Sequence, residues 1–206
     1  MPLLDHFPPP LSIERPWEGI HSTWATTIAT QQSPNGGVVT QIRAPLSPPL
    51  SVVVDFVSLD VYEVRVMQQM GGPKLRSAIE LVSPANKDQA SHRRAFAIKC
   101  AGYLQQGVAV IIVDVVTERT ANLHVALADI LGLAHPLAWC SPSQLYAVAY
   151  RPTQAAAAQR LEAWPEAFAV GAALPTIPLW LSETLCLPLT LEASYQATCA
   201  ALRIRV

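Results

Sequence analysis

Glu80 is the residue whose type and surroundings most clearly indicate chemistry. It stands in the run A-I-E-L-V, residues 78–82, where every neighbour is apolar. An apolar strand rarely keeps an ionised carboxylate unless another group pairs with it or binds to it. A basic turn follows, and the next helix carries Lys99 three residues after Phe96, at the edge of its apolar stripe. Lys99 is therefore expected to reach over the sheet toward Glu80.

Hydrophobic periodicity indicates the elements that position these two residues. The β-rich runs 61–67 and 74–83 flank a Gly-Gly turn, which predicts a β-hairpin. The predicted helix 91–106 ends before Gly107, and the continuously apolar run 108–116 is typical of a strand buried on both faces. A strand, a helix and a strand at this spacing predict a right-handed crossover with parallel pairing.

The rest of the chain surrounds this unit. Periodicity predicts helices over residues 17–32, 122–131 and from about residue 189, and strands over 51–57, 144–151 and 160–170. Residues 33–50 are expected to form a loop with at most a short strand at 38–42, and the alanine run 155–158 a hairpin linker. The proline-rich segment 1–16 is expected to lie extended on the surface, before a single domain over 17–206.

Composition limits the classes of protein to which the chain can belong. Of its 206 residues, 51% are hydrophobic and 14% charged, which excludes a disordered protein and suits one sizeable core. The apolar runs are too short to cross a bilayer, and no basic region precedes an apolar core at the N-terminus. We therefore expect a cytoplasmic protein without a membrane partner. The four cysteines and five histidines show neither disulfide nor zinc-ligand spacing.

Positive charge is concentrated around Glu80. The net charge is −1, yet seven of the fourteen basic residues lie between positions 65 and 99, where only Glu80 and Asp88 oppose them. This local excess of five positive charges can contact phosphates. A solvated helix face beside a hairpin accounts for the same residues, and the sequence leaves both interpretations open.

The segment I-E-L-V-S-P-A-N-K, followed by K-x-x-x-Y-x-x-x-G-V and a strand ending in V-D, resembles two related bacterial groups. One is the Uma-type group of restriction-endonuclease-like proteins. The closer one is the domain of unknown function numbered four-zero-five-eight, which carries S-P-A-N-K. The opening L-L-D-H-F-P-P-P-L and the segment H-S-T-W-A-T-T-I-A also look like this group. The resemblance implies an α/β fold with a restriction-endonuclease-like PD-(D/E)xK core, a mixed sheet flanked by helices.

The resemblance also implies roles for single residues. Glu80 would be the strand carboxylate, and Lys99 would be the lysine that has moved to the helix, because Val82 occupies its usual place. Clustered carboxylates bind Mg²⁺, which polarises a phosphoryl oxygen and lowers the pKa of bound water. A nearby ammonium stabilises the charge that develops on phosphorus. Glu80 equally fits a buried structural carboxylate paired with Arg65 or Arg76, and Lys99 an ordinary helix lysine.

The resemblance breaks down at the second carboxylate that such a metal site needs. Gly37 stands where members of the closer group often carry an acid. Asp60 and Glu63, on the strand before the hairpin, are the substitutes that we propose as metal ligands with Glu80. Exposed strand carboxylates are common, so the chain fits equally a protein that keeps the fold and has lost the metal site.

The turn after Glu80 offers further basic and amide groups. Asn86 and Lys87 most simply cap the next helix or satisfy backbone groups, and with Arg93 and Arg94 they are also candidates for binding substrate phosphate. Asp114 ends the buried strand, where we expect a turn-forming or capping role.

These residues lead to one predicted function and two alternatives. The first is a Mg²⁺-dependent phosphodiesterase that acts on DNA or RNA, in which Glu80 with Asp60 or Glu63 holds the ion and Lys99 assists the attacking water. The second is a catalytically inactive nuclease-like protein that binds nucleic acid or a protein partner through residues 65–99. The third is an interaction protein that uses its proline-rich N-terminus. A homodimer is left open by the sequence.

Overall fold

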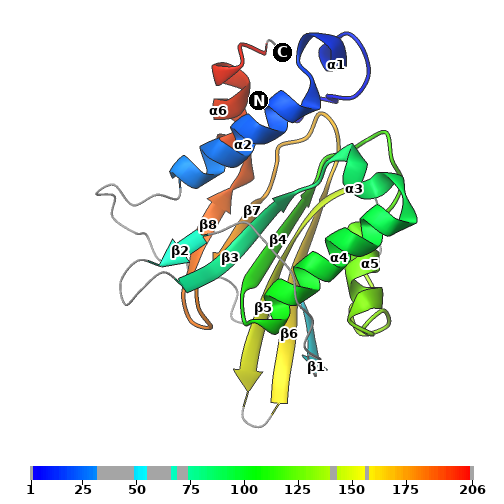
Figure 1. Ribbon diagram of the computed structural model, residues 1–206. Coiled ribbons are helices and arrows are strands. Elements are labelled where there is room, and N and C mark those ends of the chain that lie inside the picture. Colours follow the sequence, from blue (N-terminus) through cyan, green and yellow to red (C-terminus); the bar gives the residue numbers. More distant parts are fainter. Residues whose placement is uncertain are drawn as a thin grey trace.

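The structure is a computed structural model that describes residues 2–31, 49–54, 66–68, 74–139, 143–155 and 158–204 (Figure 1). Its helices are α1 (Leu11–Glu14), α2 (Trp17–Gln31), α3 (Pro84–Asp88), α4 (Ala90–Gln105), α5 (Leu123–Ile130) and α6 (Leu191–Ala201). Its strands are β1 (Leu50–Val54), β2 (Val66–Gln68), β3 (Lys74–Leu81), β4 (Ala109–Asp114), β5 (Leu145–Ala155), β6 (Ala158–Phe168), β7 (Thr176–Trp180) and β8 (Cys186–Thr190).

Six of these strands form one mixed sheet in the order β1-β6-β5-β4-β3-β2 (Figure 1). β3 and β4 pair in parallel, and the other neighbouring strands pair in antiparallel fashion. Because α3 and α4 connect β3 to β4, the predicted strand–helix–strand crossover is confirmed. The pairing of β2 with the start of β3 agrees with the predicted hairpin, and the chain is an α/β protein with a mixed sheet flanked by helices.

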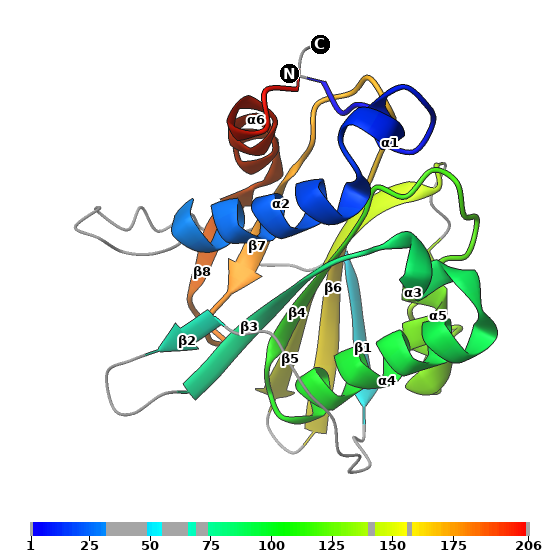
Figure 2. The same cartoon turned by 45° about the horizontal axis from the view of Figure 1, so that its top comes forward.

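Helices cover both faces of this sheet. α2 and α6 lie on one face together with the two-stranded ribbon of β7 and β8, and α3, α4 and α5 lie on the other (Figure 2). Side chains of β4 alternate between the two cores: Ile111 and Val113 pack on the α2 side, and Val110 and Ile112 on the α4 side. All six residues of β4 are buried, which explains its continuously apolar sequence.

The N-terminal segment, for which its prolines predicted a surface position, lies only partly on the surface. Leu3 and His6 are each 1% exposed, and Leu3 donates a backbone hydrogen bond of 2.9 Å to residue 172 and accepts one of 2.8 Å from residue 171. The hydroxyl of Tyr195 on α6 lies 3.0 Å from the Leu4 backbone nitrogen and 2.7 Å from Nε2 of His6. Residues 3–6 are therefore part of the core, and the prediction of an extended surface segment was wrong for them.

Other differences from the predicted elements are small. The ribbon of β7 and β8 and the short helices α1 and α3 were not predicted. The alanine run does join a hairpin, because Ala155 pairs with Ala158 across β5 and β6. Most of the predicted loop 33–50 and the predicted strand residues 55–57 and 61–65 lie outside the described residues. None of the helices in the described ranges is long and apolar enough to span a bilayer.

Candidate functional site

β3 and α4 bring Glu80 and Lys99 together. Ala78 and Val82 of the β3 segment pack into the core beneath α4. Glu80 lies between them at two-residue spacing, on the same face of the sheet, so its carboxylate points to the same helix. Lys99 Nζ lies 2.7 Å from Glu80 Oε2, and 5.3 Å from the centre of the Phe96 ring. The expected reach of Lys99 over the sheet is therefore confirmed as a contact.

The Glu80 carboxylate is buried and only half satisfied. Its side chain is 8% exposed, while that of Lys99 is 25% exposed, so water and solutes reach the ammonium but hardly the acid. Burial raises the pKa of Glu80 above its ordinary value, although the charges of Lys99 and His21 oppose this shift. The second oxygen, Oε1, is buried and has no hydrogen-bond partner among the described residues. An orphaned carboxylate oxygen is costly, which marks this position as unusual.

His21 on α2 is a neighbour of the pair that sequence reasoning did not assign to the site. Its Nε2 lies 2.8 Å from the backbone oxygen of Leu81, and because a carbonyl only accepts, this nitrogen carries the proton. The imidazole also stacks on Trp17, with ring centroids 5.8 Å apart. Spacing along α2 gives no sign of this contact, because it depends on how the helix lies against the end of β3.

The described residues offer only part of a metal site. Among them, no three His, Cys, Asp or Glu side chains come close enough to hold an ion, and Glu80 Oε1 is the single orphaned carboxylate oxygen at the pair. Asp60 and Glu63, the other predicted metal ligands, lie outside the described residues. The chemistry of Glu80 thus fits one ligand position of a divalent ion, and the remaining positions need groups from elsewhere.

The S-P-A-N-K motif acts largely as a structural turn. Ser83 begins α3, and both its backbone nitrogen and its hydroxyl donate to Asn86 Oδ1, at 2.9 and 3.0 Å. Pro84 occupies the first turn of α3, where its missing N–H costs nothing. The amide oxygen of Asn86 is thus committed to its own helix, in agreement with the capping interpretation.

Lys87 is buried rather than available to a phosphate. Its side chain and that of Asp114 are both 0% exposed, and Nζ lies 2.9 Å from Asp114 Oδ2 and 3.4 Å from the Val116 oxygen. The other Asp114 oxygen accepts from the Val116 backbone nitrogen at 3.1 Å. Burial raises the pKa of Asp114 to about 6, and the Lys87 charge limits that rise. The substrate-binding role predicted for Lys87 requires an exposed ammonium, which this structure contradicts.

Among the described residues, the remaining basic side chains of this region do not form one compact patch. Arg93 Nη1 donates to the backbone oxygens of Lys87 and Asp88, both at 3.1 Å, so it closes the end of α3. Arg94 is exposed at the start of α4, near the end of β3. Lys74 is exposed at the start of β3, so the length of the strand separates it from the start of α4 (Figure 1). The predicted phosphate-binding segment is therefore divided by the fold.

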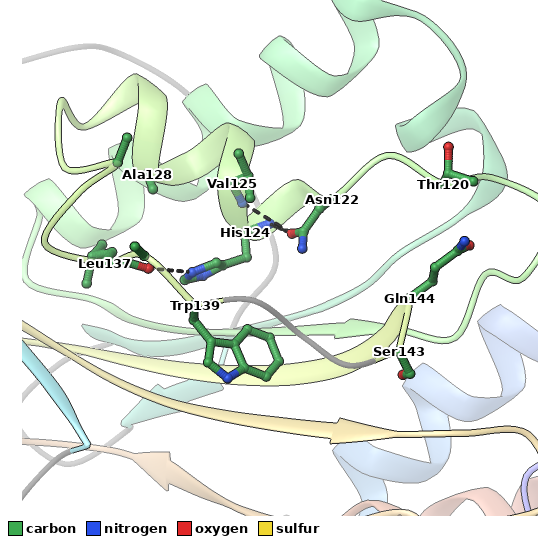
Figure 3. Close-up of a pocket in the computed structure, with 11 residues that line it drawn as sticks. Thr120, Asn122, His124, Val125, Ala128, Leu137, Trp139, Ser143 and Gln144 are labelled. Carbon is green, nitrogen blue, oxygen red and sulfur yellow. Dashed lines mark hydrogen bonds between the residues drawn. The ribbon is translucent and has the colours of Figure 1, made fainter.

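Two hollows lie away from the Glu80–Lys99 pair. The larger, about 710 Å³, opens between α5 and the segment that precedes β5 (Figure 3). The smaller, about 280 Å³, lies beside Arg76, Arg151 and Trp180. The residues that line them share no spacing motif, so sequence patterns do not reveal either hollow.

Comparisons with known proteins leave the site without a named relative. A scan against models of protein families gave no match, and searches of curated proteins and of solved structures found no similar protein. The described fold defines the class as α/β, with a six-stranded mixed sheet flanked by helices. The narrower restriction-endonuclease-like assignment stays a hypothesis from the sequence.

Proposed function

We propose that this chain is a metal-dependent phosphodiesterase with a restriction-endonuclease-like core, and that Glu80 and Lys99 belong to its active site. The observation that carries the proposal is the ion pair between a buried strand carboxylate and a solvent-accessible amine on the following helix, with one carboxylate oxygen that has no hydrogen-bond partner among the described residues. A purely structural ion pair gains nothing from an orphaned oxygen, whereas a ligand-binding carboxylate needs one.

Each side chain has a distinct part in this proposal. Glu80 Oε1, which accepts no hydrogen bond from the described residues, would bind a divalent ion such as Mg²⁺, and that ion would polarise the phosphoryl group and acidify water. Lys99 opposes the rise that burial causes in the pKa of Glu80, and its 2.7 Å contact orients the carboxylate. Its partly exposed ammonium also places positive charge where a phosphate can approach. The further carboxylate comes from outside the described residues, and Asp60 and Glu63 are the candidates.

The test measures metal binding and cleavage with the same preparations. Binding of Mg²⁺ and of Mn²⁺ to the native chain is measured by calorimetry. Cleavage of single- and double-stranded DNA and RNA is then measured at increasing concentrations of each ion. Glu80→Gln should abolish metal binding, and Lys99→Met should lower the cleavage rate about a hundredfold or more. Glu118→Gln, at an exposed acid, serves as the matched control and should leave both unchanged. Metal binding or cleavage that persists in Glu80→Gln would contradict the proposal.

A second candidate function is a catalytically inactive nuclease-like fold that binds nucleic acid or a protein. It is favoured by the charge balance at the pair, since Lys99 already neutralises Glu80 and the described residues add no second acid. The same titrations separate the two candidates. Binding without cleavage, with an affinity that falls steeply with salt and is equal in Glu80→Gln, supports a nucleic-acid-binding module. Absence of both binding and cleavage favours a protein partner.

A further inference from the structure

The larger cavity has an uncharged lining. It measures about 710 Å³, within the usual range of small-molecule sites, and the eleven described residues around it include no Asp, Glu, Lys or Arg. Most are apolar or aromatic, with a few amide and hydroxyl side chains among them. A lining of this kind suits a neutral ligand, because a phosphate or carboxylate would lose its hydration without gaining a counter-charge.

One wall of the cavity is aromatic and held in place. His124 Nε2 donates to the Leu137 backbone oxygen at 2.9 Å, so Nδ1 is the nitrogen that accepts from the Tyr150 hydroxyl. Both nitrogens are therefore used, and burial lowers the pKa of His124, which keeps the ring neutral. Trp139 stands perpendicular to His124 and to Tyr146, with centroid distances of 5.9 and 6.0 Å. These neighbours fix the indole, so the wall exists before any ligand arrives.

Asn122 supplies directed hydrogen-bond donors beside this wall. Its Oδ1 accepts from the backbone nitrogens of His124 and Val125, at 2.9 and 3.2 Å, and thereby caps α5. The amide nitrogen must then face away from the helix, and Figure 3 shows it pointing toward the Trp139 ring. Across the cavity, the exposed side chain of Gln144 points toward Thr120 (Figure 3). Amides and hydroxyls both donate and accept hydrogen bonds.

We infer that this cavity binds a neutral planar heteroaromatic ring of the nucleobase class, placed against Trp139 and accepting a hydrogen bond from Asn122. Base stacking on an aromatic side chain is favourable for any base, and a ring nitrogen or exocyclic oxygen matches the Asn122 donor. A sugar ring fits less well, because its many hydroxyls need more partners than the few polar side chains here provide. The inference does not depend on the Glu80–Lys99 pair.

The test titrates the full chain with adenosine, guanosine, cytidine and uridine by calorimetry. We expect saturable binding of at least one nucleoside, weakened about tenfold or more in Trp139→Leu. Asn122→Ser keeps a helix-capping oxygen and removes the amide donor, so it should weaken binding about two- to tenfold without unfolding the chain. His135→Ala, at an exposed residue of the same segment outside the lining, is the control and should bind like the native chain.

A second titration with short single-stranded oligonucleotides identifies the source of the base. Binding of nucleosides points to a free metabolite, and binding of oligonucleotides alone points to a nucleic acid, provided that abasic oligonucleotides bind less tightly. Equal binding of abasic and intact oligonucleotides would overturn the inference, since the ring would then play no part. So would a failure of all nucleosides and oligonucleotides to bind at millimolar concentration, or unchanged affinity in both Trp139→Leu and Asn122→Ser.

Discussion

The ion pair of Lys87 with Asp114 should be the polar contact on which stability depends most, and Asp114→Asn is its most informative perturbation. The variant keeps the shape of the side chain but replaces the carboxylate with a neutral amide, so the Lys87 ammonium loses its counter-charge and keeps only neutral acceptors, among them the Val116 oxygen at 3.4 Å. Because both side chains are 0% exposed, water cannot replace the lost carboxylate. We expect a loss of about 3–5 kcal/mol in the free energy of unfolding.

Lys87→Met should lower the free energy of unfolding by less than Asp114→Asn does. Without the ammonium, the Asp114 carboxyl takes up a proton, and its pKa in the native chain is already raised to about 6. Protonating it at neutral pH costs about 1–2 kcal/mol. The double variant Lys87→Met/Asp114→Asn should be more stable than Asp114→Asn alone, because it contains no buried charge at this position.

The assay is urea unfolding at neutral pH, followed by far-ultraviolet circular dichroism and by tryptophan fluorescence. Arg119 and Asp88 form the control pair, since their side chains are 44% and 51% exposed and 3.9 Å apart. Arg119→Ala should change the unfolding free energy by less than about 1 kcal/mol. The reasoning is refuted if Asp114→Asn costs no more than Arg119→Ala, or if adding Lys87→Met to it brings no recovery of stability.

Three further predictions concern pH and capping. Lys99→Met should raise the pKa of Glu80 further. Because the folded chain then holds this proton more tightly than the unfolded chain, the unfolding free energy should fall more, as pH rises above the ordinary value of 4.5, than it does for the native chain. Parallel curves for the two proteins would contradict this. Asn86→Ala, which removes the acceptor of the Ser83 backbone N–H, should cost about 1 kcal/mol in urea unfolding, and Asn86→Asp much less. Burial lowers the pKa of His6 from 6.5 to about 4, so the unfolded chain binds the extra proton and stability falls as pH drops through this interval. His6→Gln should lack this component of the fall, as measured by thermal unfolding across that pH range.

Local patterns were sufficient to predict the unit that carries Glu80 and Lys99. The apolar run of β4, the stripe of α4 and the glycine after it are set by neighbours in the sequence, and Gly107 does adopt a positive φ of 74°. The position of Lys99 followed from its spacing after Phe96. Its contact with Glu80 could be expected because the strand and the helix that follows it pack directly on each other.

The position of Lys87 was within reach of the sequence and was missed. Lys87 follows the end of β3 by six residues, and Asp114 is the last residue of β4. The carboxyl ends of parallel neighbouring strands meet at one edge of a sheet, so a lysine and an aspartate there are natural partners. The polar composition of the turn concealed this pairing, because composition does not tell whether a side chain points inward.

Other misses arose from prolines and from contacts that only the folded chain creates. Strands β7 and β8 were not predicted, and each contains a proline; Pro178 and Pro188 stand opposite each other in a two-stranded ribbon, whose outer edges need no donor. Leu3 and His6 are buried by α6 and by the backbone near residue 171, elements that follow them by well over a hundred residues. The cavity beside Trp139 likewise depends on α5 and on residues up to Gln144, which share no motif.

The two lysines Lys87 and Lys99, which follow β3, pair with two different acids on this side of the sheet. Glu80 is opposite Ile112 in the parallel register, and Asp114 lies two residues further along β4, so both carboxylates point to the face covered by α3 and α4. Lys87 forms a fully buried ion pair with Asp114, which fixes the turn after β3 to the end of β4. Lys99 remains partly exposed, and the other oxygen of Glu80 has no hydrogen-bond partner in the part of the chain that the structure describes. Chemistry on a solute requires an amine that the solute can reach, so a substrate of the proposed enzyme must approach along α4, on the side of Lys99.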